Sequence, residues 1–146
     1  MKQQGLNKCW MEGKGAINGW CSIPSTITAE IMSLNKFDSI TIDLQHGLID
    51  YQVALNILQV FSKIEATPMV RVPWNEPGII MKMLDAGSLG IICPMINSRE
   101  DAERFVSYCR YAPKGTRSFG PGRAMLYAGN DYAKEANENI LTLAMI

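Results

Sequence analysis

Histidine is scarce in this sequence, and no two cysteines stand at C-x-x-C spacing. His46 is the only imidazole, and the four cysteines are dispersed at Cys9, Cys21, Cys93 and Cys109. A zinc finger is excluded because it needs more clustered Cys and His ligands than this chain contains. The chain also lacks an apolar run near the ~18 residues of a membrane span, and its start lacks the apolar stretch of a signal peptide. We therefore expect a cytoplasmic protein with reduced thiols.

An excess of charge of one sign is missing as well. The 14 basic and 14 acidic side chains cancel, and the basic residues are scattered along the chain. Nucleic acids and anionic membranes are bound by clustered positive charge, so neither is an expected partner. What the 146 residues do have is a hydrophobic fraction of 47%, which is typical of one globular domain with a real core.

Short β-type runs alternate with helical patterns along the whole chain. Strands are predicted at 16–23, 39–44, 67–72, 89–95 and 140–146. Helices are predicted at 26–34, 50–64, 77–86, 98–110 and 127–137, with Ser25 or Thr26, Asp50 and Ser98 or Asn97 as N-caps and Gly87 as a C-terminal cap. Repeated βα units imply parallel strands joined by right-handed crossovers.

Two architectures fit this alternation: a doubly wound sheet and the first part of a barrel. The last predicted strand ends at Ile146 with no helix after it, which leaves a long unpaired edge. We therefore expect the N-terminal portion of a single barrel domain of about 250 residues, truncated within the fifth strand. The alternative is a non-catalytic half-barrel that pairs with a second copy or another chain.

Polar residues follow the second predicted strand, where an α/β barrel carries its active site. Asp43 and His46 are three residues apart there, with Gln45 between them. A carboxylate can orient an imidazole and favour its protonated form, so this pair could serve as a general acid or base. The competing interpretation, of about equal weight, is that His46 only closes a loop.

A charged residue also closes the third predicted strand. Arg71 follows apolar neighbours, so its guanidinium must be paired or face an open site. Its planar fork suits a carboxylate or an enolate oxygen, and the alternative is a structural ion pair with a neighbouring strand. Residues 114–124 contain glycines, hydroxyls and two arginines, but an ordinary flexible loop is favoured over an anion site there. Trp10 and Trp20 are predicted to be packing residues.

Several ordered segments together resemble the HpcH/HpaI family of class II, metal-dependent aldolases. The resemblance covers about residues 15–146 and is carried by FDSITIDLQHG (37–47), PMVRVPWNEP (68–77), LDAG (84–87) followed by GIICPMI (90–96), and YCRYAPKGTRS (108–118). It implies a (βα)₈ TIM barrel of the phosphoenolpyruvate/pyruvate-binding type, usually in a homo-oligomer. The implied reaction is reversible cleavage of a 2-keto-4-hydroxy acid to pyruvate and an aldehyde.

The resemblance also implies roles and a cofactor. His46 matches the family's base, Asp43 the aspartate that assists it, and Arg71 the arginine that binds substrate and stabilises the enolate oxygen. The implied cofactor is a divalent cation (Mg or Mn, with Co or Zn as alternatives), which polarises the ketone. Its glutamate and aspartate ligands are expected beyond Ile146, so no metal ligand is assigned in this chain, and the chain alone is expected to be inactive.

Two further points qualify the resemblance. Gln45 stands where many family members have glutamate, so the hydrogen bonding around His46 is expected to differ. A related citrate- or malyl-type acyl-CoA lyase is the alternative function, because it shares the barrel and the metal–enolate chemistry. The loop from Asp43 to His46 argues against that relative.

Overall fold

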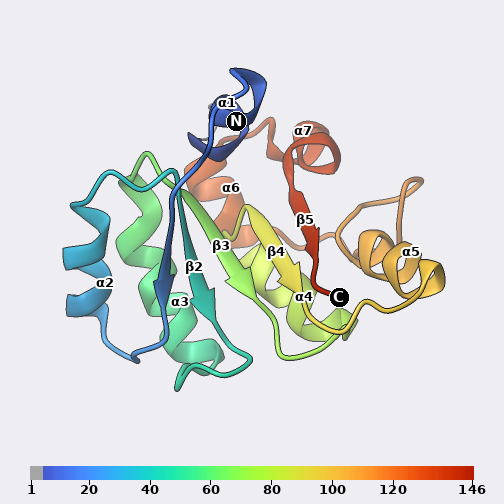
Figure 1. The fold of residues 1–146 in the computed structure, drawn as a ribbon. Coiled ribbons are helices and arrows are strands. Elements are labelled where there is room, and N and C mark those ends of the chain that lie inside the picture. The colour runs from blue at the N-terminus through green and yellow to red at the C-terminus, as the bar shows by residue number, and fades with distance from the viewer. Residues whose placement is uncertain (1–4) are drawn as a thin grey trace.

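A computed structural model describes residues 5–146, and five parallel strands form its single sheet. They are β1 (Asn18–Cys21), β2 (Ser39–Asp43), β3 (Thr67–Arg71), β4 (Gly90–Cys93) and β5 (Leu141–Ala144). Each strand pairs with the next along the chain, in the order β1-β2-β3-β4-β5 (Figure 1). A doubly wound sheet would reverse its strand order at a switch point. The sheet is therefore an arc of a (βα)₈ barrel, and the doubly wound alternative is wrong.

One helix precedes the first strand and lies at the amino ends of the strands, and the other helices connect the strands and cover the outer side of the arc (Figure 1). They are α1 (Gly5–Met11), α2 (Thr26–Ser33), α3 (Tyr51–Val60) with the 3₁₀ turn η1 (Phe61–Lys63), α4 (Pro77–Asp85), α5 (Arg99–Tyr108), α6 (Gly122–Ala128) and α7 (Tyr132–Asn139). Three helices, α5, α6 and α7, lie between β4 and β5. Within residues 5–146, every helix is too short to cross a membrane.

Capping side chains fix where the helices begin. Ser25 accepts a hydrogen bond from the main-chain N–H of Thr28. In the same way, Asp50 accepts from the N–H of Val53, and Ser98 accepts from the N–H of Asp101. These predicted caps are confirmed, as is Gly87, whose φ of +108° suits a glycine at the end of α4. The N-cap of α4 itself is Glu76, which was not among the predicted caps.

The segment between β4 and β5 differs from the prediction. The single helix expected at 127–137 is two helices, α6 and α7, and the break between them falls at Gly129, where φ is +84°. That backbone conformation is cheap only for glycine, so it ends α6 and turns the chain. Helix α1 was also not predicted, because one buried side chain, Leu6, gives it no periodic pattern.

The core is divided between the two faces of the sheet. Ile40, Ile42 and Val70 point to the helix-covered face, where they belong to the larger apolar cluster. Met69 and Ile92 point to the other face and form a small cluster with Leu6. This alternation is the period-two pattern of strands with both faces covered. The small cluster occupies the face that lines the interior of a barrel.

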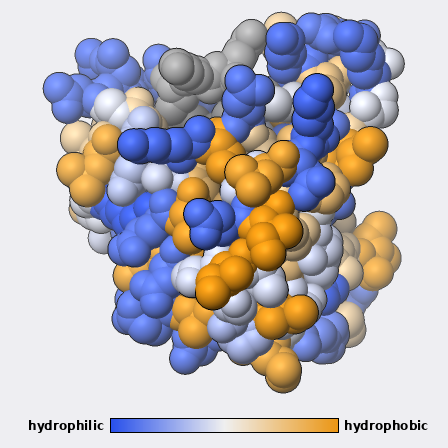
Figure 2. All heavy atoms as spheres, turned by 90° about the vertical axis from the view of Figure 1, so that its left-hand side faces the viewer, coloured by the Kyte–Doolittle hydropathy of each residue, from blue (hydrophilic) through white to orange (hydrophobic). Residues whose placement is uncertain are grey.

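Apolar side chains also gather on the outside of the molecule, over α2 and the edge strand β1 (Figure 2). Ile27 and Ile31 lie one turn apart on α2, and both are exposed. Ile17 and Ile23, on either side of β1 in the sequence, and Leu34, at the end of α2, are exposed as well. This apolar surface lies beside β1, which is the open edge of the arc.

Candidate active site

An ion pair joins the carboxyl ends of β2 and β3. The pairing register sets Asp43 directly opposite Arg71. Arg71 donates from Nε to Oδ1 of Asp43 at 2.9 Å and from Nη2 to Oδ2 at 2.6 Å. Both side chains are largely buried. The interpretation of Arg71 as one half of an ion pair with a neighbouring strand is therefore confirmed, and the pair lies at the end of the sheet where barrel enzymes have their active sites.

Asp43 also holds the loop that follows it. Its Oδ1 accepts the main-chain N–H groups of Gln45 at 3.0 Å and His46 at 3.2 Å. Gly47 completes this turn, because a Cβ there would lie 2.2 Å from the carbonyl oxygen of Asp43. One carboxylate therefore positions both Arg71 and the backbone that carries His46.

These contacts set the acidity of Asp43. Burial alone would raise the pKa of this carboxyl group. The hydrogen bonds from Arg71, from the main chain of Gln45 and His46, and from the indole of Trp20 outweigh burial and lower the pKa to about 2. Asp43 is accordingly a carboxylate at neutral pH, and its role is to accept hydrogen bonds.

Lowering the pH should destabilise the protein through this group. Because the folded-state pKa lies below the unfolded value of 3.8, the stabilising contribution is complete above about pH 4 and is lost as the pH falls towards 2. The expected loss is about 2 kcal/mol in the free energy of unfolding. Urea titrations between pH 2 and 7 would measure it. Asp43→Asn should flatten this part of the profile, and an unchanged slope in that variant would contradict the assignment.

His46 is exposed at the same end of the sheet. Its contact with Asp43 runs through the main chain, and among residues 5–146 no hydrogen bond joins the carboxylate to the imidazole. The expected carboxylate–imidazole pair is therefore not formed in this structure. The Asp43 carboxylate instead accepts hydrogen bonds from Arg71 and from the two main-chain N–H groups of Gln45 and His46. The roles of His46 as base and of Asp43 as its helper stay predictions, and Asp43 acts on His46 through the loop.

Two amide side chains in the connections after β2 and β3 carry oxygens without a hydrogen-bond partner in the described part of the chain. They are Gln45 Oε1 and Asn75 Oδ1, and both oxygens are buried. Asn75 follows β3, and its Nδ2 donates to the carbonyl of Asp101. Buried acceptors without donors are costly, so these oxygens are positions where a water or a substrate hydroxyl would be stabilised.

Trp20 belongs to this site, although the sequence pattern predicted a packing residue. It is 41% exposed and belongs to neither apolar cluster. The indole Nε1 donates to Asp43 Oδ2 at 3.3 Å, and the Arg71 guanidinium carbon lies 4.9 Å from the ring centroid. The packing prediction for Trp20 therefore missed these contacts with the ion pair. Trp10, also predicted to pack, is exposed as well.

The described residues do not fit a metal centre. Within 5–146, no three His, Cys, Asp or Glu side chains come together. The carboxylate nearest the expected site, Asp43, already accepts hydrogen bonds at both oxygens. The glutamate and aspartate ligands that the family resemblance implies would have to come from outside this stretch of the chain.

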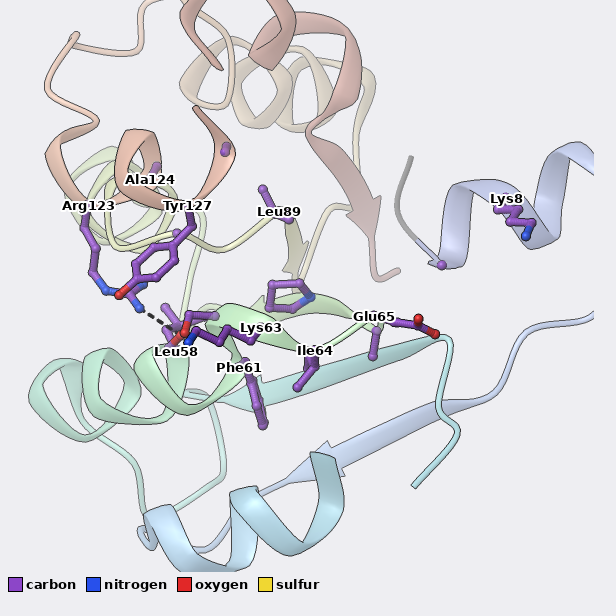
Figure 3. A pocket seen from close by; sticks show the side chains of 16 residues that line it. Lys8, Leu58, Phe61, Lys63, Ile64, Glu65, Leu89, Arg123, Ala124 and Tyr127 are labelled. Atoms are coloured by element: carbon purple, nitrogen blue, oxygen red, sulfur yellow. Dashed lines mark hydrogen bonds between the residues drawn. The ribbon is translucent and has the colours of Figure 1, made fainter. Parts of the chain in front are cut away.

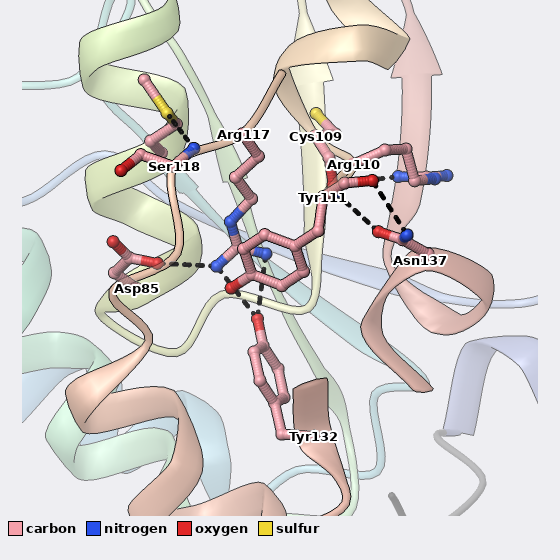
Figure 4. Close-up of polar contacts among 9 residues, drawn as sticks. Asp85, Cys109, Arg110, Tyr111, Arg117, Ser118, Tyr132 and Asn137 are labelled. Carbon is pink, nitrogen blue, oxygen red and sulfur yellow. Dashed lines mark hydrogen bonds and ion pairs between the residues drawn. The ribbon is translucent and has the colours of Figure 1, made fainter. Parts of the chain in front are cut away.

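Both arginines of residues 114–124 bind to other groups of the protein. Arg117 is buried against Asp85, Tyr111 and Tyr132 (Figure 4). Arg123 donates to the main-chain carbonyls of Ala86 and Leu58. Both guanidinium groups are engaged, so this segment is anchored to the rest of the protein, whereas an ordinary flexible loop was expected.

A hollow of about 850 Å³ lies at the opposite, amino end of the strands. It is bounded by η1, α6 and α1, and Lys63, Arg123 and Tyr127 are among its lining residues (Figure 3). If size were the only criterion, this hollow would be the candidate ligand site. The residues that can move protons and stabilise an oxyanion are instead at the carboxyl end, so we place the candidate active site around Asp43, His46 and Arg71.

The sequence is similar to that of known aldolases. The family model described as HpcH/HpaI aldolase/citrate lyase matches residues 19–146. A hydroxypyruvate/pyruvate aldolase from Rhizorhabdus wittichii is 43% identical over 97% of this chain and 56% of its own length. A 5-keto-4-deoxy-D-glucarate aldolase from Salmonella paratyphi A is 33% identical over 89% of this chain and 52% of its own.

Structural similarity leads to the same family. The crystal structure of an HpcH/HpaI aldolase/citrate lyase family protein from Burkholderia cenocepacia J2315 superimposes with a TM-score of 0.86 at 27% identity, over 97% of this chain and 59% of that one. The chain spans about half the length of the relatives it matches. The family match, the sequence identity and the barrel arc agree, and the chain belongs to the HpcH/HpaI aldolase/citrate lyase family.

Proposed function

We propose that the protein carrying this chain is a class II aldolase, a carbon–carbon lyase. It would cleave a 2-keto-4-hydroxy acid, with or without a 3-deoxy position, reversibly to pyruvate and an aldehyde through a pyruvate enolate. The observation that carries the proposal is the side-on Asp43–Arg71 pair, which uses Nε and Nη2 of the guanidinium. Nη1 makes no hydrogen bond to any described residue, so its N–H groups are free to stabilise a developing enolate oxygen.

His46 supplies the proton transfer in this proposal. Its imidazole is exposed on the loop that Asp43 holds, so we propose that it takes the proton from the substrate's 4-hydroxyl group during cleavage. In the reverse direction it returns that proton to the new alkoxide. Asp43 fixes the distance between the imidazole-bearing loop and Arg71, because the same carboxylate holds both.

The cofactor and the remaining site are part of the proposal. A divalent cation, Mg²⁺ or Mn²⁺ with Co²⁺ or Zn²⁺ as alternatives, supplies electrophilic activation of the ketone when bound. Its glutamate and aspartate ligands would come from outside residues 5–146, since the described side chains do not fit the ion. We further propose that the protein is cytoplasmic and forms a homo-oligomer.

Pyruvate release tests this function. The full-length protein, incubated with a 4-hydroxy-2-keto acid, should release pyruvate without coenzyme A. EDTA should reduce the rate by at least about 100-fold, and added Mg²⁺ or Mn²⁺ should restore it. Pyruvate is measured continuously through lactate dehydrogenase and NADH. A rate unaffected by EDTA would contradict the metal requirement, and no pyruvate from any such acid would contradict the aldolase.

The same assay separates the alternative, a citrate- or malyl-type acyl-CoA lyase, which the family's own description makes relevant. Cleavage that needs a coenzyme A thioester would favour it. The half-barrel hypothesis is tested by sedimentation of the 146-residue chain. A discrete dimer would favour pairing through the open strand edges and the apolar face of α2, and a folded monomer would contradict it.

A further inference from the structure

Trp20 contacts both members of the ion pair from a third strand. It lies on β1, one strand away from Asp43 and two from Arg71. Its indole N–H donates to Asp43 Oδ2 at 3.3 Å, the oxygen that also accepts the shorter bond from Arg71 Nη2. Its ring lies 4.9 Å from the centre of the Arg71 guanidinium.

Trp20 lies on the face of the sheet that lines the interior of a barrel, in the same row as Thr41 and Met69. In this five-stranded arc the residue is 41% exposed, and it belongs to neither apolar cluster of the described residues. Both specific contacts recorded for the Trp20 side chain are to Asp43 and Arg71.

The contacts restrain Arg71 in complementary directions. Asp43 bonds to one edge of the guanidinium and fixes it within its own plane. A ring against the guanidinium restrains the remaining motion, the tilt out of that plane. Together they hold Nη1, the nitrogen without a described partner, in one place. Placement matters because a displacement of about 1 Å at a reacting centre can cost about 100-fold in rate.

We propose that Trp20 is a positioning residue for Arg71. It holds the guanidinium against Asp43 so that Nη1 meets the enolate oxygen of the substrate. Trp20 acts through Arg71 and makes no proton transfer of its own. This inference rests on the proposed aldolase function, and its test is arranged so that the two can fail separately.

A double-mutant cycle on kcat tests the inference in the full-length protein. Trp20→Leu removes both contacts and should lower kcat by about tenfold with little change in KM. Trp20→Phe keeps a ring face but loses the indole donor, and should lower kcat by about threefold. In the Arg71→Ala background, Trp20→Leu should change the residual rate by less than about twofold, because the group it positions is gone. All four kcat values come from the same pyruvate-release assay, run with more enzyme and longer times in the Arg71→Ala background.

A second readout does not depend on activity. The Arg71 Nε–H, held by Asp43, should exchange with solvent more rapidly in Trp20→Leu than in the wild type, as measured by ¹⁵N NMR. Trp10→Leu is the matched control, because Trp10 is similarly exposed but lies on α1, and it should change neither readout.

The outcomes are distinct. Equal losses from Trp20→Leu with and without Arg71, or an unchanged Nε–H exchange rate, would overturn the positioning role. If no variant or wild-type protein releases pyruvate, the aldolase proposal fails, and the exchange measurement still decides whether Trp20 restrains Arg71. A loss confined to KM would mean that Trp20 contacts substrate directly, which also overturns the proposal.

Discussion

Replacing Arg71 by alanine in the full-length protein should lower the retro-aldol kcat by about 100-fold or more. The reason is that Nη1 is the guanidinium nitrogen free to stabilise negative charge, and alanine has no donor. Arg71→Lys keeps the charge but cannot form the side-on pair with Asp43, so we expect a loss of about tenfold or more. Rates come from the coupled pyruvate assay. Arg99→Ala, at an exposed arginine paired with Glu103 on α5, is the matched control and should leave kcat unchanged.

His46→Ala should have a comparable effect on kcat, with a smaller effect on folding. The imidazole is exposed and makes no hydrogen bond within residues 5–146, so little stability depends on it. Arg71→Ala differs, because it strips the buried Asp43 of its cation and should also lower the free energy of unfolding by about 3 kcal/mol. Thermal unfolding of both variants separates the effects. Near-normal turnover in His46→Ala would remove histidine from the role of base.

Much of the fold was predictable because its signals are local. Asp50 and Ser98 begin helices by bonding to N–H groups three residues on, and Gly87 ends α4 with a backbone angle that suits glycine. The sequence could not distinguish a barrel from an open, doubly wound sheet. Both have the same βα alternation, and the strand order that separates them depends on long-range contacts. The break at Gly129 was missed, because a single glycine within a helical pattern is often tolerated.

The site was predictable in its residue types but not in its contacts. Asp43 and Arg71 both end apolar strands, and a neighbouring-strand ion pair was one of the two interpretations offered for Arg71. Arg71 pairs with Asp43 because the register of β2 against β3 sets the two residues opposite each other. No local sequence pattern determines that register. Because the Asp43 carboxylate is bound to Arg71, it makes no hydrogen bond to the His46 imidazole, its predicted partner. The contacts of Trp20 with the ion pair were not predicted, because a tryptophan in a strand gives no sign of which face it occupies.

A second buried ion pair holds the long connection between β4 and β5. The Arg117 side chain has no exposed surface and donates to Asp85 Oδ1 at 2.7 Å and to the Tyr132 hydroxyl at 3.1 Å (Figure 4). Its guanidinium also lies 4.4 Å from the ring centroid of Tyr111. The cluster joins the end of α4 to α7 through residues far apart in the chain. Nothing in the sequence around Arg117 could identify those partners.

Asp85→Ala should therefore be among the most destabilising single substitutions, lowering the free energy of unfolding by about 3 kcal/mol. It leaves the Arg117 charge buried with only hydroxyl and aromatic partners. Arg117→Met alone removes that charge and leaves Asp85, which is partly solvated, so its cost should be smaller. The double variant should then be more stable than Asp85→Ala, although it has lost more groups. Glu103→Ala, which breaks an exposed pair, is the control and should cost less than about 0.5 kcal/mol. Urea titrations give all four values, and a double variant no more stable than Asp85→Ala would mean that the uncompensated Arg117 charge is not the source of the destabilisation.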